Sequence, residues 1–166
     1  AFTTIDDPEA YFQTVIYTGN GSADHAITLP GDTDMQPDLV WIKNRDQTDS
    51  HCWFDSVRGA TKVMHTDGTG AEATDADTLD SFTSDGFQVD ADVKVNTNTE
   101  AYVAWCWKES ATAGFVIVTW TGNGSARTIS HSLSAVPHWI IIKAVDRSGP
   151  DWITFGDKIH TTPHDA

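Results

Sequence analysis

The sequence lacks several features that mark particular protein classes. Only two of its 166 residues are cysteine, Cys52 and Cys106, and both have apolar neighbours. We expect buried free thiols, the common state of cysteine in such surroundings; pairing in a secreted domain is the alternative. No run approaches the roughly 20 consecutive apolar residues of a membrane-spanning helix. The N-terminal stretch AFTTIDDPEA also lacks the basic and apolar regions of a signal peptide. The sequence therefore predicts no membrane partner.

Basic residues are scarce as well. The chain has 10 lysines and arginines against 24 aspartates and glutamates, which gives a formal net charge of −14. The acids are spread along the whole chain rather than gathered in a tail. Such a surface repels the phosphate backbone of nucleic acids and keeps a protein soluble. We therefore expect no nucleic acid among the partners.

Motifs of catalysis and of cofactor binding are missing too. The sequence has no G-x-S-x-G elbow and no H-x-H or C-x-x-C spacing. GNGSAD and GNGSAR fail the dinucleotide fingerprint, because Asp24 and Arg127 stand where its last glycine is required. We expect no enzyme activity, no cofactor and no transition-metal site. Residues 75–80 offer carboxylates that could hold calcium, with a solvated acidic loop as the alternative.

What the sequence does contain is a series of short β-branched and aromatic runs, separated by Gly, Asn, Asp and Pro and without helical periodicity. This pattern predicts an all-β protein, an antiparallel β-sandwich. The expected strands are TVIYT, HAITL, DLVWIK, HCWFDS, TKVMH, TLDSF, GFQV and AYVAWCWK. We predict a hairpin turn at three Asn-Gly or Asp-Gly pairs between strand-like runs, at residues 20–21, 85–86 and 123–124.

The chain also contains an internal repeat. YTGNGS at residues 17–22 returns as WTGNGS at residues 120–125, and each copy continues to a proline, an apolar run and a lysine, Lys43 or Lys143. We predict an N-terminal arm at residues 1–13, a first repeat at 14–109, a linker at 110–113 and the start of a second, incomplete repeat at 114–166.

The second copy has no counterpart of TLDSF, GFQV or AYVAWCWK. A sandwich without those strands would leave open edges and a half-covered core. We therefore expect either a fragment of a longer repeat protein or an assembly in which neighbours complete the second unit.

Charged and aromatic residues follow the DLVWIK run and its counterpart. Charged groups at strand ends can form a recognition rim, and two tryptophans could stack on sugar rings. The candidate ligand-binding residues are Asn44, Arg45, Asp46, Trp53, Arg58 and Trp152. The alternative is a structural role, in which Lys43, Asp55 and Arg58 brace a turn while the tryptophans fill the core.

The motifs YTGNGS, QPDLVWIKNR, FDSVRGATK, TLDSFTSDGF and YVAWCWK occur in this order. In them the chain resembles a repeat domain of poorly characterised function, found in tail-fibre-like and other virion structural proteins of tailed bacteriophages, commonly marine or aquatic ones. The resemblance covers residues 11–109 and, in diverged form, 114–166. In the second copy KAVDRSGPDWITFGD replaces KNRDQTDSHCWFDSVRG, so no role of Arg45 or Arg58 carries over to it.

The resemblance implies a non-enzymatic virion component with a lectin-like sandwich of the jelly-roll or concanavalin-like type. It further implies assembly in the host cytoplasm, release by lysis, contacts with other virion subunits, and adsorption to host cell-surface glycans. A fibre would be a homo-oligomer, most simply a trimer. A purely architectural capsid decoration or neck protein is the first alternative, and an envelope-polysaccharide hydrolase is the second.

Overall fold

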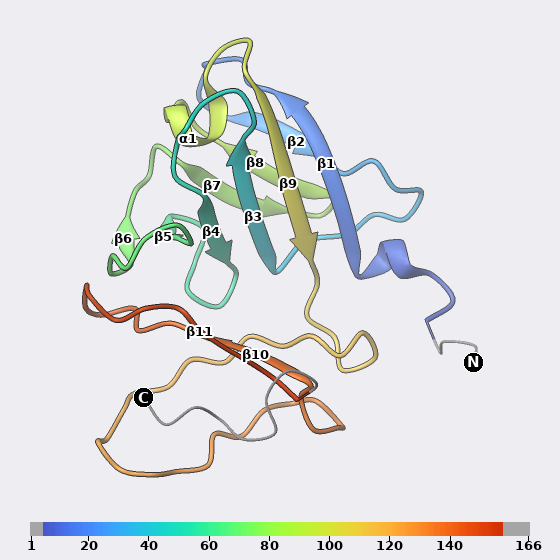
Figure 1. Ribbon diagram of the computed structural model, residues 1–166. Coiled ribbons are helices and arrows are strands. Elements are labelled where there is room, and N and C mark those ends of the chain that lie inside the picture. The colour runs from blue at the N-terminus through green and yellow to red at the C-terminus, as the bar shows by residue number, and fades with distance from the viewer. Residues whose placement is uncertain (1–4, 158–166) are drawn as a thin grey trace.

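The computed structural model of the protein describes residues 5–157 and contains three antiparallel sheets (Figure 1). The largest has the strand order β1 (Phe12–Thr18), β9 (Ala101–Trp107), β3 (Leu39–Asn44), β4 (Cys52–Asp55), β5 (Lys62–His65) and β6 (Ala73–Thr74). The second has the order β2 (His25–Thr28), β8 (Gly86–Val89) and β7 (Leu79–Thr83). The third is a hairpin of β10 (Trp139–Ile142) and β11 (Ile153–Gly156).

The six-stranded and three-stranded sheets pack face to face, so the predicted all-β, antiparallel sandwich is confirmed. Every predicted run contains a strand, with ends that differ by at most two residues. β1 begins at Phe12, within the region assigned to the N-terminal arm. Four short elements were not predicted from the sequence: β6, β11, the 3-10 helix η1 (Pro8–Ala10) and the single helical turn α1 (Val93–Asn96).

The core lies between the two sheets. In β9, Tyr102, Ala104 and Cys106 are buried, while Val103, Trp105 and Trp107 on the opposite face are only partly buried. Tyr102 stacks on Tyr17 of β1 with ring centroids 5.2 Å apart, and Phe87 of β8 meets Tyr17 edge-on at 6.2 Å. Each large apolar side chain buried in this way stabilises the fold by about 1.5–3 kcal/mol, so this contact between the sheets dominates the stability.

The first Gly-Asn-Gly-Ser turn does not close a hairpin, and that prediction was wrong. β1 and β2 belong to different sheets, so the turn carries the chain from one sheet to the other. The buried Asn96 side chain holds it: its Oδ1 accepts from the Asn20 N–H at 2.9 Å, and its Nδ2 donates to the Ser22 carbonyl at 2.8 Å. A Cβ on Gly19 would lie 2.1 Å from the Thr97 carbonyl oxygen, so the close approach of two backbones requires glycine there.

The second predicted hairpin, at Asp85-Gly86, is confirmed. β7 and β8 pair with Thr83 opposite Gly86. Gly86 has a φ of +134°, and a Cβ there would lie 2.1 Å from the carbonyl oxygen of Ile27 on β2. Glycine is needed both for the turn and for the passage of the neighbouring strand.

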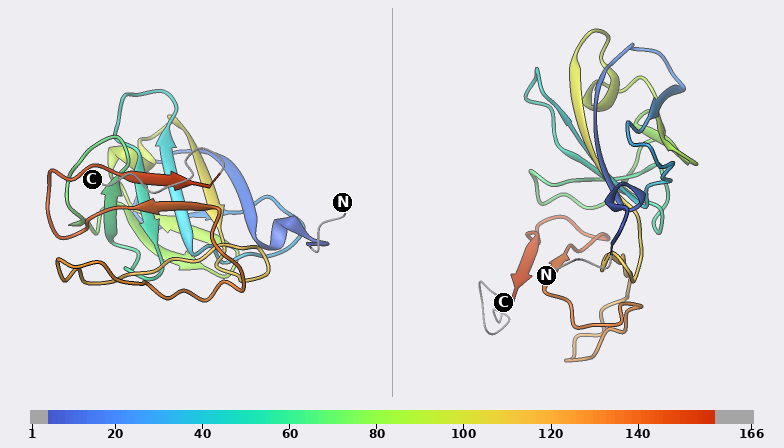
Figure 2. Two further views of the ribbon diagram at one scale, coloured as in Figure 1. Left: turned by 60° about the horizontal axis from the view of Figure 1, so that its bottom comes forward. Right: turned by 90° about the vertical axis from the view of Figure 1, so that its right-hand side faces the viewer.

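The third predicted hairpin, around residues 123–124, is not formed, because residues 116–133 contain no strand. In the first unit β1 pairs with β9 alone. No segment between residues 114 and 157 takes the place of β9, so the apolar run at 115–120 has no strand with which to pair its backbone groups. β10 and β11 form because they need only each other. Figure 2 shows their hairpin beneath the sandwich, joined to it by the chain that follows β9.

Candidate functional site

Aromatic side chains gather on the outer face of the six-stranded sheet. Strand pairing places Trp105 beside Trp41, and Trp41 beside Trp53, in one row that crosses β9, β3 and β4. Phe12 pairs with Trp107 in the next row. Two rings from the second repeat extend the rows. We call the whole set the aromatic strip: Phe12, Trp41, Trp53, Trp105, Trp107, Phe115 and Trp152.

The first row is a chain of indole rings in contact. The centroid of Trp41 lies 5.2 Å from that of Trp105 and 5.8 Å from that of Trp53. Trp53 in turn lies 5.6 Å from Trp152. Tilted pairs at such distances add about 0.5–1.5 kcal/mol each beyond the burial of their surface. The rings therefore support one another and hold fixed orientations.

The second row is shorter. The Trp107 centroid lies 5.0 Å from that of Phe12 and 6.4 Å from that of Phe115. The strip is only partly covered: its tryptophans on the sheet keep part of their surface in solvent, and on β1 Phe12 and Ile16 are 41% and 64% exposed. An apolar face of this kind marks a contact surface. Indole planes suit the flat C–H face of a sugar ring or the side chains of a protein partner.

The structure brings together two of the predicted residues, Trp53 and Trp152, which come from different repeats. The indole Nε1 of Trp152 donates to the carbonyls of His65 and Gly68, at 3.2 and 3.1 Å. Trp152 therefore anchors the loop between β10 and β11 to the loop after β5. Its ring completes the strip at the end nearest the hairpin.

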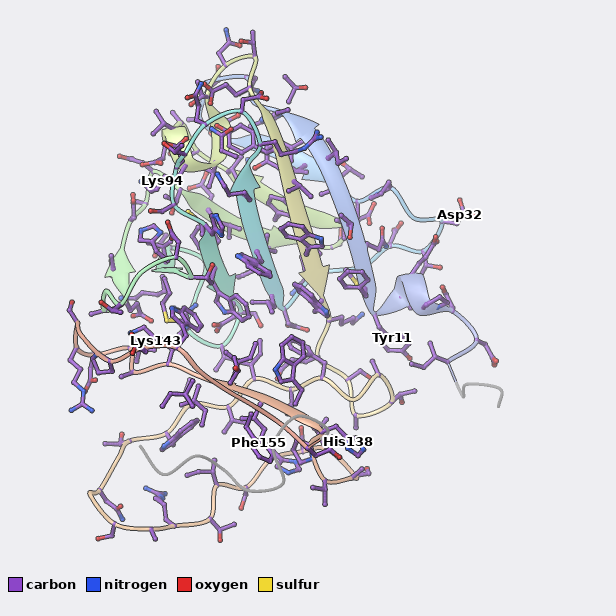
Figure 3. All side chains as sticks on the ribbon, viewed as in Figure 1. Tyr11, Asp32, Lys94, His138, Lys143 and Phe155 are labelled. Atoms are coloured by element: carbon purple, nitrogen blue, oxygen red, sulfur yellow. The ribbon has the colours of Figure 1, made fainter. Side chains whose placement is uncertain are left out.

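Backbone hydrogen bonds strengthen the same joint between the two repeats. The Glu72 N–H donates to the Val145 carbonyl and the Gly149 N–H to the Thr69 carbonyl, both at 2.9 Å. Figure 3 shows Lys143 at this end of the hairpin and His138 toward the other end. The orientation of Trp152 against the strip is thus fixed by main-chain contacts as well as by its own ring.

Arg58 of the predicted set lies in a buried ion network. Its side chain is 7% exposed; Nε donates to Asp55 at 2.6 Å and Nη1 to Glu72 at 3.0 Å. Nη2 donates to the Trp53 carbonyl at 3.3 Å. The structural alternative considered from the sequence holds for Arg58 and Asp55, which brace the turn after β4. It does not hold for the tryptophans, which lie on the outer face and not in the core.

Asn44 is also enclosed, with none of its surface exposed. Its Oδ1 accepts from the N–H groups of Asp46 and Gln47, while its Nδ2 donates to Asp49 at 2.8 Å and Glu100 at 2.6 Å. All its hydrogen-bonding capacity is spent inside the protein. Asn44 therefore shapes the loop after β3 and offers no group to a ligand.

Arg45 and Asp46 lie at the surface of that loop. Both are exposed, and Asp46 Oδ2 accepts from the Ala101 N–H at 2.6 Å. This bond fixes the loop to the start of β9. Of the six predicted residues, Arg45, Asp46, Trp53 and Trp152 present surface to solvent in this region.

Within residues 5–157 no group of three or more His, Cys, Asp or Glu side chains could hold a metal ion. Cys52 and Cys106 are buried free thiols, as predicted, and burial raises the pKa of each to about 12, so neither is a ready nucleophile. None of the helices in residues 5–157 has the length and apolar character needed to span a bilayer.

One open depression of about 210 Å³ lies beside β1. It is lined by Glu9, Phe12, Gln13, Thr14, Pro30 and Gly31. Its floor is shaped by the buried Gln13, whose Oε1 accepts from the Gly31 N–H at 2.8 Å. The depression is too small and too open to enclose a substrate, since ligand pockets usually measure about 300–1,000 Å³.

Sequence reasoning missed most of the strip. In the run AYVAWCWK, Val103, Trp105 and Trp107 fall on one face, but the sequence gives no reason to join them to Trp41 and Phe12. The signal present is alternation: Trp41 stands opposite the buried Val40 and Ile42 in its run, and Trp105 and Trp107 stand opposite the buried residues of theirs. The order of strands in the sheet decides which of these rings are in contact. That order cannot be predicted from the alternation of residues within a strand.

Comparison with known proteins gives one result at the level of the family. No curated protein and no solved structure matches the chain. The match to a family covers residues 7–165, nearly the whole chain. The chain belongs to the family described as Domain of unknown function (DUF7483).

Proposed function

We propose that the chain is a non-enzymatic structural protein of a bacteriophage virion, a tail-fibre or appendage component, and that it adsorbs host cell-surface glycans through its aromatic strip. The observation that carries the proposal is the strip itself, with partly exposed indole rings on the outer face of one sheet beside the exposed Phe12 and Ile16. A row of neighbouring rings suits an extended polysaccharide, since an exposed indole face can stack on a sugar ring.

Two further observations support this assignment. The motifs quoted above resemble repeat domains of tailed-phage virion proteins. A sandwich followed by the hairpin of a second unit also suits an elongated appendage, in which repeats follow one another in series and each contacts its neighbours. The acidic surface, with a net charge of −14, keeps such a particle soluble and turns it away from nucleic acid.

Glycan adsorption is tested by removing one ring from the open part of the strip. Trp105 contacts Trp41 and pairs with the exposed Thr14 of β1. We expect Trp105→Ala to weaken binding at least tenfold, measured by titration of the chain against a panel of purified bacterial lipopolysaccharides and capsular polysaccharides. The matched control is Trp139→Ala, which removes a 70% exposed tryptophan from the hairpin. Adsorption is refuted if no polysaccharide binds or if both variants lose affinity equally.

The appendage form is tested by the mass of the chain in solution. Fibres are closed symmetric oligomers, and we propose a trimer. Light scattering should then give three times the 18.1 kDa of one chain. A monomer at every concentration would contradict the trimeric fibre and favour a virion protein that is attached as a single copy.

A second candidate function is purely architectural, and the hairpin favours it. Three apolar side chains in and beside the hairpin are exposed, Val136 by 81%, Trp139 by 70% and Ile153 by 46%. Exposure of apolar surface to water is unfavourable, and contact with another virion subunit would bury it. If the role is architectural, Trp139→Ala should impair particle assembly, and Trp105→Ala should leave adsorption to cells unchanged. The two candidates therefore predict opposite outcomes for the same pair of variants.

A further inference from the structure

The second repeat reproduces local geometry of the first, and lysine shows it most directly. Lys43 Nζ donates to two backbone carbonyls of the loop after β3, at 2.8 and 3.1 Å. Lys143 Nζ donates to two carbonyls of the loop after β10, both at 3.1 Å. β10 and β11 thus occupy the places that β3 and β4 have in the first unit.

Equivalent backbone positions form hydrogen bonds in the two hairpins, β3–β4 and β10–β11. In the first, the Ser56 N–H donates to the Asp38 carbonyl at 2.8 Å; in the second, the Asp157 N–H donates to the His138 carbonyl at 3.0 Å. Position 138 therefore corresponds to position 38. Since N–H groups alternate in direction along a strand, positions 139 and 141 correspond to 39 and 41, whose N–H groups face β9.

The Gly-Asn-Gly-Ser turn also has one conformation in both copies. Asn20 Oδ1 accepts from the Ser22 N–H at 2.8 Å, and Asn123 Oδ1 accepts from the Ser125 N–H at 3.1 Å. The glycine between each pair has a φ of +66° in the first turn and +72° in the second. The turn is therefore a local structure that forms without its docking partner.

The docking partner in the first unit is residues 92–107, which we call the closing segment. It contains α1 and β9; Asn96 holds the turn, and β9 lies between β1 and β3. Nothing within residues 5–157 plays this part for the second unit. Residues 121–125 are exposed throughout, and β10 has β11 as its one neighbour in the described chain.

We propose that the second unit binds a polypeptide segment with the chemistry of the closing segment, supplied from outside residues 5–157. The asparagine of this segment holds the turn at 121–125, and its strand pairs with β10 on one edge and residues 115–120 on the other. The proposal rests on the internal repeat and is independent of glycan adsorption.

The chemistry of the site selects this occupant. The open edge of β10 presents the N–H groups of Trp139 and Ile141 at strand spacing, which an extended peptide satisfies and a sugar does not. The β9 of a second copy is already paired on both edges, so it is not free to enter. The closing segment with the following lysine carries two acids and two bases, so the chain, at −14, does not repel it.

The test uses the full chain and a synthetic peptide of residues 92–109 carrying Cys106→Ala. Hydrogen exchange is followed by NMR with saturating peptide. We expect at least tenfold slower exchange of the Trp139 and Ile141 amides and of residues 115–125, with no change in the first sandwich. A scrambled peptide of the same composition should have no effect.

Two proline variants locate the contact. Ile141 pairs with Thr154, and each N–H of this pair points away from the hairpin, toward opposite edges. Ile141→Pro should therefore weaken peptide binding at least tenfold, while Thr154→Pro should leave it unchanged. If Ile141→Pro unfolds the hairpin, a peptide N-methylated at the Trp105 position makes the same test on the unaltered chain, because Trp105 pairs with Trp41 in the first unit.

Three results would overturn the proposal. The first is unchanged exchange at saturating peptide. The second is equal protection by the scrambled peptide. The third is protection of the Trp139 and Ile141 amides that grows with protein concentration when no peptide is present, because a second copy of the chain would then be the occupant.

Discussion

The indole rings of Trp53 and Trp152 lie 5.6 Å apart between centroids and are tilted by 55°. Trp53 belongs to β4 of the sandwich and Trp152 to the loop that precedes β11, so the pair joins the two repeats. It also continues the row of rings that begins at Trp105. This contact thus helps to hold the second unit against the sandwich and extends the candidate binding face.

Replacing Trp152 should release this joint. Trp152→Ala removes the ring contact and two hydrogen bonds of the indole Nε1, together worth about 2 kcal/mol. The amides of Glu72 and Gly149, which donate across the joint, should then exchange roughly 30-fold faster in NMR hydrogen exchange. Trp139→Ala is the control and should leave these amides protected. Unchanged protection in Trp152→Ala would mean that backbone contacts alone hold the joint.

The two copies of the turn should respond differently to the same substitution. A Cβ on Gly19 would lie 2.1 Å from the Thr97 carbonyl oxygen, whereas nothing lies within 4 Å of a Cβ on Gly122, its counterpart. Gly19→Ala should therefore lower the free energy of unfolding by about 2–3 kcal/mol, and Gly122→Ala by less than about 0.5 kcal/mol. Urea denaturation measures both. Equal effects would contradict the account of the turn as a docked element in the first unit alone.

Arg58 should be a stability residue. Arg58→Met would leave Asp55 buried, with a side chain 4% exposed and without its cation. Removal of one partner from such a pair costs about 3–5 kcal/mol of folding free energy. Arg45→Met, at an exposed position after β3, should change stability by less than about 0.5 kcal/mol. The urea midpoints of the two variants separate a structural role for Arg58 from a role in ligand binding, since a ligand-binding arginine would leave the midpoint unchanged.

The buried thiols should make the fold sensitive to alkaline pH. Burial raises the pKa of Cys52 and of Cys106 from 9.0 to about 12. The unfolded thiols ionise first as pH rises, so stability is complete below pH 9 and falls between pH 9 and 12. We expect a loss of about 1 kcal/mol per thiol between pH 8 and 10.

The measurement is the urea midpoint at the two pH values, with the double variant Cys52→Ala and Cys106→Ala as control. In the double variant the loss should shrink by the contribution of both thiols. The same burial predicts that neither thiol reacts with a disulfide reagent at pH 8 until the chain unfolds. Rapid reaction of the folded chain would show that a thiol is accessible.

Short β-branched and aromatic runs, separated by Gly, Asn, Asp and Pro, predicted the sandwich and most strands of the first unit. The pattern succeeds because β-branched and aromatic residues favour strands while Gly, Asn, Asp and Pro favour turns, and both preferences are properties of the local sequence. The paired phrases YTGNGS and WTGNGS indicated the repeat for a similar reason. Both patterns depend on residues that are close together in the sequence, so they can be recognised without knowledge of the fold.

Tertiary structure decided which elements meet. Asn20-Gly21 predicts a turn, and the structure has one. The hydrogen bond from the Asn20 N–H to Asn96 holds this turn, and the chain passes to the other sheet instead of forming a hairpin. The same phrase around Asn123 is followed by no sheet, because a strand needs a partner for its backbone groups and no segment there supplies one. Pairing depends on what lies across the sheet, and the neighbouring residues in the sequence do not carry that information.

The candidate site, too, was predictable from the sequence only in part. The sequence by itself determined that Trp105 and Trp107 share one face of their run, and that Trp53 and Trp152 stand within one position of each other in the two repeats. Only the tertiary structure decided that these rings form one strip, that Trp152 reaches Trp53, and that Arg58 and Asn44 are enclosed. The physical reason is that the covalent chain fixes which side chains of one strand share a face. Contact between side chains of different strands depends on the order of the strands in the sheet.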